Sequence, residues 1–224
     1  MTTKILLYFD ILTQQVKDKI SNYITDKTIN HAISTALEFH LMSKGSVDFQ
    51  DYYLRTISNT EYFLSANNFF RVFKKRYALQ AIDNNYLDWL EQEKQSIIQL
   101  IDNNQLTKLY FNYFARAQIL HNNEIVVRDL GSFFTKFVHT FKPNDFCPLD
   151  NPIKKYFGLS RESFYIAFLI VSRAYREWTT DNKRLIEQIR QRLKQLDKTA
   201  RLESDRMTDL KLLDLIFWYE ANRG

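Results

Sequence analysis

Apolar side chains recur every three or four positions along nearly the whole chain, which is the spacing that gathers them on one face of an α-helix. The first run holds Ile5, Phe9, Leu12 and Val16, and others follow to the end of the chain, at residues 29–41, 52–57, 69–77, 86–101, 106–114, 126–130, 133–141, 164–178, 181–196 and 210–217. No Asn-Gly or Asp-Gly turn and no alternating strand pattern of useful length interrupts them. The pattern predicts an all-α protein of about ten helices.

One segment, residues 142–152, is expected to be irregular, because all three prolines of the chain (Pro143, Pro148 and Pro152) lie in it. A proline fixes φ and removes an N–H donor, so it ends helices and stiffens turns. Asp150 lies in this segment, and a stiff loop is a good place to hold a carboxylate in one orientation. Asp150 is therefore a candidate catalytic residue, although an Asp before Asn151-Pro152 also fits an ordinary helix N-cap.

The residues before this loop predict a helix-hairpin-helix. We expect a helix to end at Leu130-Gly131, a tight turn to follow, and a second helix to run into the proline loop. Backbone N–H groups at such a hairpin and at a helix N-terminus favour an anion. Gly131, Ser132 and Thr135 are therefore expected to bind a phosphate, together with Lys136.

Residues 124–157 resemble the helix-hairpin-helix DNA glycosylase superfamily, whose signature is a hairpin, a helix, a Gly/Pro-rich loop and an aspartate. Pro148-Leu149-Asp150 resembles the Pro-x-Asp that ends that loop, and residues 209–218 resemble the closing helix. The resemblance implies two helical lobes with a cleft between them, double-stranded DNA as partner and a base flipped into a pocket. It implies that the Asp150 carboxylate stabilises positive charge on the sugar or activates water.

The resemblance also implies a monofunctional enzyme. Bifunctional members attack the sugar with a lysine early in the second hairpin helix, where this chain has Ser132, and Lys136 lies one turn further on. Tyr156 and Phe157 follow the loop and are expected to stack on the base. The target base is left open, and repair of damage and removal of a modified phage base are both compatible with it.

Composition adds weaker signals. The net charge of +5 permits a polyanionic partner, and Arg71, Lys74 and Lys75 share one helical face that contacts phosphates or is simply solvated. Aromatic residues make up 15% of the chain, as core or as base-stacking surfaces. The lone Cys147 fits a reducing cytoplasm. No membrane span and no cofactor is expected. No metal site is expected either, because the four histidines are isolated in the sequence. Residues 1–224 are interpreted as one domain.

Two alternatives remain open. The chain is compatible with a non-catalytic nucleic-acid-binding or scaffold protein of the same fold. Arg116 and His121, with four residues between them in an expected helix, resemble the Arg-x4-His motif of HEPN-type ribonucleases. In that case the histidine and the arginine would act on the 2′-OH and the scissile phosphate.

Overall fold

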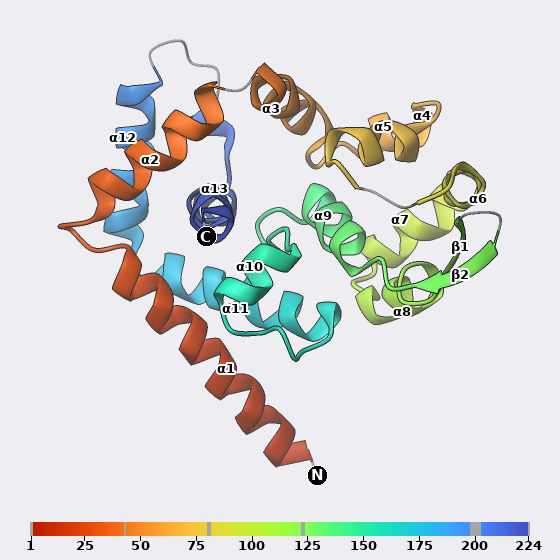
Figure 1. Cartoon of the computed structure of the whole chain (residues 1–224), viewed down its shortest axis with the longest axis horizontal. Coiled ribbons are helices and arrows are strands. Elements are labelled where there is room, and N and C mark those ends of the chain that lie inside the picture. The colour runs from red at the N-terminus through yellow and green to blue at the C-terminus, as the bar shows by residue number, and fades with distance from the viewer. Residues whose placement is uncertain (1, 43, 80–81, 122–123, 198–202, 224) are drawn as a thin grey trace.

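The computed structural model describes residues 2–42, 44–79, 82–121, 124–197 and 203–223. The described residues are mostly helical, as the apolar spacing predicts, with a short 3-10 helix (Ser204–Arg206) and one two-stranded sheet in addition. The elements, labelled as in Figure 1, are α1 (Thr2–Tyr23), α2 (Ile29–Met42), α3 (Lys44–Thr56), α4 (Thr60–Ser65), α5 (Phe69–Arg76), α6 (Asn84–Gln92), α7 (Lys94–Asp102), α8 (Leu106–Tyr113), β1 (Ala117–His121), β2 (Glu124–Arg128), α9 (Gly131–Phe141), α10 (Asn151–Tyr156), α11 (Phe164–Asp181), α12 (Lys183–Leu196) and α13 (Asp209–Asn222).

The elements pack as two groups (Figure 1). In one group α1 lies along α11, α2 packs on α12 and α13, and α10 packs on α13. In the other, α5 packs on α6, α7 packs on α4 and α8, and β1 packs on α6. Helix α9 contacts α11 of the first group and sends its aromatic side chains into the second, so it lies between them.

Aromatic rings from α5 and α9 build much of the core of the second group. Phe133 and Phe137, one turn apart on α9, are fully buried. The Phe133 ring lies 5.4 Å from that of Phe73, and the Phe137 ring lies 5.3 Å from that of Phe70. Such ring pairs stabilise a core beyond the area they bury. These rings therefore serve packing, one of the two roles considered for the aromatic residues.

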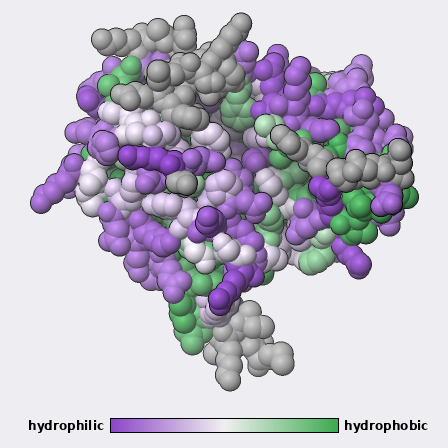
Figure 2. Space-filling view, viewed as in Figure 1, coloured by the Kyte–Doolittle hydropathy of each residue, from purple (hydrophilic) through white to green (hydrophobic). Residues whose placement is uncertain are grey.

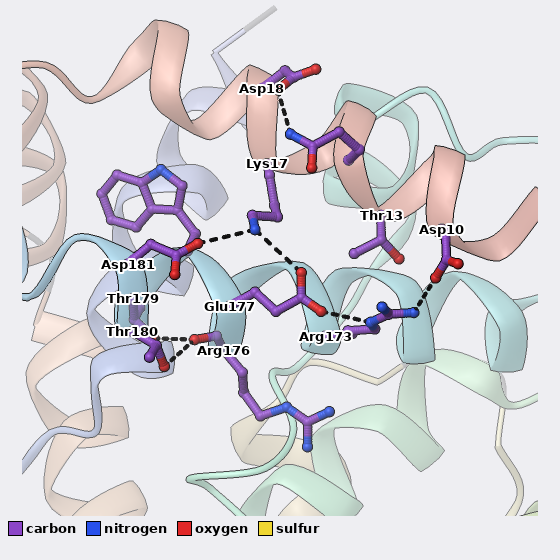
Figure 3. Close-up of polar contacts among 12 residues, drawn as sticks. Asp10, Thr13, Lys17, Asp18, Arg173, Arg176, Glu177, Thr179, Thr180 and Asp181 are labelled. Atoms are coloured by element: carbon purple, nitrogen blue, oxygen red, sulfur yellow. Dashed lines mark hydrogen bonds and ion pairs between the residues drawn. The ribbon is translucent and has the colours of Figure 1, made fainter. Parts of the chain in front are cut away.

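Charged side chains join α1 to α11 at the surface of the first group (Figure 3). Lys17 of α1 lies 3.2 Å from Glu177 and 3.1 Å from Asp181 of α11, and Arg173 of α11 bridges Glu177 and Asp10 of α1. These pairs are partly exposed, so each is worth little by itself. Together they link two places along α1, at Asp10 and Lys17, to α11.

The structure corrects the expectation of helix at residues 116–121 and 126–130. Residues 117–121 and 124–128 form an antiparallel hairpin in which Ile119 pairs with Val126 and Leu120 with Ile125. β-Branched side chains favour strands, and burial alternates, with Ile119 buried and Leu120 exposed. The hairpin leads into α9 at Gly131, so the expected helix-hairpin-helix is wrong in its first half.

Candidate functional site

A cavity of about 490 Å³ lies between α9, α10 and α13 on one side and α3 and the end of α5 on the other. On the side viewed in Figure 1, the surface is hollowed between the two groups of helices (Figure 2). The cavity is lined by apolar and charged side chains together, among them Phe49, Arg76, Tyr77, Lys136, Asp150, Lys211, Asp214 and Trp218.

Asp150 is held in this cavity by two N–H donors. It is the N-cap of α10, and its Oδ1 accepts from the Ile153 backbone N–H at 3.1 Å. Its Oδ2 accepts from the indole N–H of Trp218 on α13, also at 3.1 Å. Pro152 in the first turn of α10 fixes the backbone after the cap. The two roles considered for Asp150, cap and cavity carboxylate, are therefore compatible, because one side chain occupies both positions.

Lys136 lies in the same cavity, on α9. Its Nζ donates to Ser132 Oγ at 2.9 Å, one turn back along the helix. Burial lowers the pKa of Lys136 below its usual range, and the nearby carboxylate of Asp150 opposes that shift. The sequence placed Lys136 among the DNA contacts, and the structure brings it together with Asp150.

A second acid and base, Asp214 and Lys211, complete the cavity and were not predicted from the sequence. The Lys211 Nζ lies 2.5 Å from Asp214 Oδ2, three residues apart on α13. Asp214 is 4% exposed, and burial raises the pKa of its carboxyl while Lys211 opposes that rise. An acid and a lysine three residues apart in the otherwise apolar stretch of residues 210–218 were the available signal.

Behind Lys211 lies a buried polar pair. The Lys211 ammonium lies 5.4 Å from the ring of Tyr53, and the Tyr53 hydroxyl is 2.9 Å from Nε2 of His139 on α9. The other ring nitrogen of His139, Nδ1, is 2.7 Å from the carbonyl oxygen of Phe146 in the proline loop. This chain of contacts connects the loop that carries Asp150 with α9, α3 and α13.

The basic residues of α5 lie next to the cavity. Arg76, at the end of α5, lines the cavity, and Ala78 lines both the cavity and a neighbouring recess formed by Arg71, Lys74 and Lys75. Arg71 binds Asp88 with two hydrogen bonds to one oxygen and one to the other, and Lys74 donates to the Ile82 carbonyl at 2.5 Å. Lys75 and Arg76 are exposed. These two are the basic side chains best placed for an external anion.

The expected phosphate site at the start of α9 is not supported. A Cβ on Gly131 would lie 2.1 Å from the Cβ of Phe164, so this glycine permits close packing of α9 on α11. Thr135 is fully buried, and its hydroxyl donates to the Leu149 carbonyl at 2.8 Å and accepts from the Leu149 N–H. Ser132 is half-buried and bonded to Lys136. These residues position the proline loop and Lys136.

Of the expected base-stacking residues, Phe157 packs in the core of the first group and the half-buried Tyr156 packs against that core. Phe157 is buried with its ring 5.2 Å from that of Phe217, and the ring of Tyr156 lies 5.7 Å from the same residue. Neither lines the cavity, whose rings come from Phe49, Tyr77 and Trp218. Choosing residues by their position after the loop was wrong, because the aromatic rings of the cavity come from α3, α13 and the residue after α5.

The expectation that Arg116 and His121 share a helix is also wrong. Arg116 precedes β1, and His121 is the last residue of β1. The side chain of His121 lies outside the described residues. The Arg-x4-His spacing therefore does not place the two side chains one turn apart on a helix.

Comparisons of the chain with protein-family models, with curated proteins and with solved structures found no match. No described helix is both long enough and apolar enough to cross a membrane. Among the described side chains, no group of three or more His, Cys, Asp or Glu is arranged to hold a metal ion.

Proposed function

We propose that the cavity is the active site of a monofunctional DNA glycosylase that hydrolyses the bond between a modified base and its sugar. The observation that carries the proposal is the placement of Asp150, a carboxylate fixed by two N–H donors and facing a cavity that also holds a lysine. The proposal depends on this cavity and not on the superfamily's hairpin, because a β-hairpin precedes α9.

Each group in the cavity has a role in such a reaction. As the base leaves, positive charge develops on the sugar, and the carboxylate of Asp150 stabilises that charge and accepts a proton from the attacking water. Negative charge develops on the departing base, and Lys136 supplies a positive charge in the same cavity. Phe49, Tyr77 and Trp218 provide ring surfaces against which a flat base packs.

The volume and surroundings of the cavity fit a base brought in from a duplex. About 490 Å³ is within the range of small-ligand sites. Lys75 and Arg76 are exposed beside it, where they are available to phosphates of the flanking backbone. The net charge of +5 favours association with DNA in general.

The test is base release from duplexes that carry alkylated, oxidised or deaminated bases. We expect Asp150→Asn to lower the rate at least about 100-fold. Asp83→Asn is the matched control, because Asp83 also caps a helix through its carboxylate, on α6 outside this cavity. Asn caps helices as well as Asp does, so neither change should unfold the chain. Full activity in Asp150→Asn would reject the proposal.

A duplex-binding protein without catalysis is the second candidate. The observation that favours it is that each oxygen of Asp150 already accepts an N–H, one from the capped helix and one from Trp218, so contacts within the chain account for this carboxylate. This function predicts duplex binding that weakens steeply with salt, with no base released from any of the duplexes above.

A further inference from the structure

The β-hairpin has one covered edge and one open edge. On the β1 side, the backbone N–H of Leu120 donates to Asp83 Oδ2 at 2.8 Å, and Asp83 is the N-cap of α6. On the β2 side, no strand among the described residues pairs with it. Ile125 and Val127 of β2 are 73% and 58% exposed. The open edge is therefore flanked by exposed aliphatic side chains.

The bond from Leu120 to Asp83 shows which backbone groups point out of this edge. Leu120 sends its N–H away from β2, so its pair with Ile125 is one of the non-hydrogen-bonded pairs of the ladder. Ile125 therefore points its own N–H and C=O away from β1, and the alternation of the ladder gives Val127 the same orientation. These groups have no strand partner among the described residues.

The sequence of β2, Glu124-Ile125-Val126-Val127-Arg128, is complementary to itself when two copies run antiparallel. With Val126 on a two-fold axis, Ile125 lies opposite Val127 of the partner subunit, and these are the residues whose backbone groups point outward. Glu124 then lies opposite Arg128 of the partner subunit, in a non-hydrogen-bonded pair, where opposing side chains are closest. Opposite charges at both ends thus fix the register.

We propose that β2 pairs with β2 of a second copy of this chain, so that the two hairpins form one four-stranded antiparallel sheet. The edge carries no Lys and no Pro, the residues that commonly keep an exposed strand unpaired. No ion pair between described side chains involves Glu124 or Arg128, so neither has to break an ion pair with one of these side chains to join the partner. The interface goes beyond the proposed function and does not depend on it.

The test is the oligomeric state of the full chain, measured by sedimentation velocity over a range of concentrations. The wild type is expected to form dimers. Glu124→Arg and Arg128→Glu should each weaken the dimer roughly 10-fold or more, because two symmetry-related pairs change from attraction to repulsion. The doubly exchanged chain, E124R with R128E, restores opposite charges at both ends and should dimerise like the wild type.

An equal mixture of the two single variants provides the internal control. In Glu124→Arg both ends of β2 are positive, and in Arg128→Glu both ends are negative. A mixed dimer should therefore form, even though neither variant pairs well with itself. Recovery of the dimer in the mixture also shows that both variants are folded. A wild type that remains monomeric at every concentration would overturn the proposal, and so would a dimer that survives both single charge reversals.

Discussion

His139 is fully buried on α9, and its two ring nitrogens have different partners. Nδ1 faces the carbonyl oxygen of Phe146, which only accepts, so Nδ1 carries the proton. In the neutral ring Nε2 is then an acceptor, and the Tyr53 hydroxyl donates to it. Burial lowers the pKa of His139 to about 3, with the positive charge of Lys211 as the second cause. The folded chain therefore holds this side chain neutral.

The lowered pKa of His139 predicts that the chain becomes less stable as the pH is lowered. The unfolded chain binds the proton below its pKa of 6.5 and the folded chain only below about 3, so the contribution of His139 is complete above pH 6.5 and is lost as pH falls. The expected slope is about 1.4 kcal/mol per pH unit. Urea unfolding at several pH values between these limits measures it. In His139→Gln the slope should lessen by that amount, and an unchanged slope would contradict the assignment.

Lys211 and Asp214 form a buried ion pair, so substitutions at the two positions are expected to have strongly coupled effects on the free energy of unfolding. Removing one partner of a buried ion pair leaves a charge without compensation, so Asp214→Asn should lower the free energy of unfolding by about 3 kcal/mol. Lys211→Met together with Asp214→Asn removes both charges and should cost less than the sum of the two single changes. A double-mutant cycle from urea unfolding measures the difference. Strictly additive losses would show that the two charges do not depend on each other.

The residues of the cavity differ in how far the sequence predicted them. Asp150 was predicted, because three prolines around it mark a rigid loop, and that is a local signal. Asp214 was missed, because it reaches the cavity only when α13 packs beside α9 and α10, and no local pattern in the sequence encodes that packing. Tyr156 and Phe157 were assigned to the cavity from proximity in the chain, and tertiary packing places Phe157 in the core and Tyr156 against it instead.

At the scale of elements, α9 connects the aromatic core with the cavity. One face carries Phe133 and Phe137 into the aromatic core, and Lys136 reaches the cavity. Its first residue, Gly131, lies against Phe164 of α11 so closely that a Cβ does not fit. The position of Lys136 is thus set by how near α9 approaches α11.

Gly131→Ala is expected to destabilise the chain by about 1–3 kcal/mol, because α9 must move away from α11 to admit the new methyl group. Ser132→Ala, at the next position, loses one hydrogen bond to Lys136 and should cost about 1 kcal/mol or less. Thermal and urea unfolding of the two variants give the comparison. Equal stability of Gly131→Ala and wild type would contradict the tight approach of the two helices.

The sequence pattern was reliable for long helices and failed for the short strands. Residues 164–178 and 210–217 repeat apolar side chains over several turns, and both lie in the observed α11 and α13. The spacing of Val126, Val127 and Leu130 is compatible both with one turn of a helix and with the end of a strand. Five-residue strands give too few alternations to decide, and pairing of β1 with β2 settles the conformation.

At the scale of the whole molecule, the two groups of helices leave the cavity between them, with Lys75 and Arg76 exposed near it. If these two side chains contact phosphates, Lys75→Ala with Arg76→Ala should weaken duplex binding and reduce the slope of log K against log salt by about 2. Lys27→Ala with Lys183→Ala is the matched control, since it removes the same charge from exposed positions of the first group. Equal losses in both double variants would indicate that only net charge matters.

The most direct measurement is single-turnover base release by the wild type and by Asp150→Asn, with Trp218→Phe beside them. Trp218→Phe removes the indole donor to Oδ2 but leaves the carboxylate and its bond to Ile153. We predict release by the wild type, partial loss in Trp218→Phe and loss of at least about 100-fold in Asp150→Asn, with all three chains equally folded. Wild-type rates in the Asp150→Asn variant would contradict the assignment of this carboxylate to the chemistry.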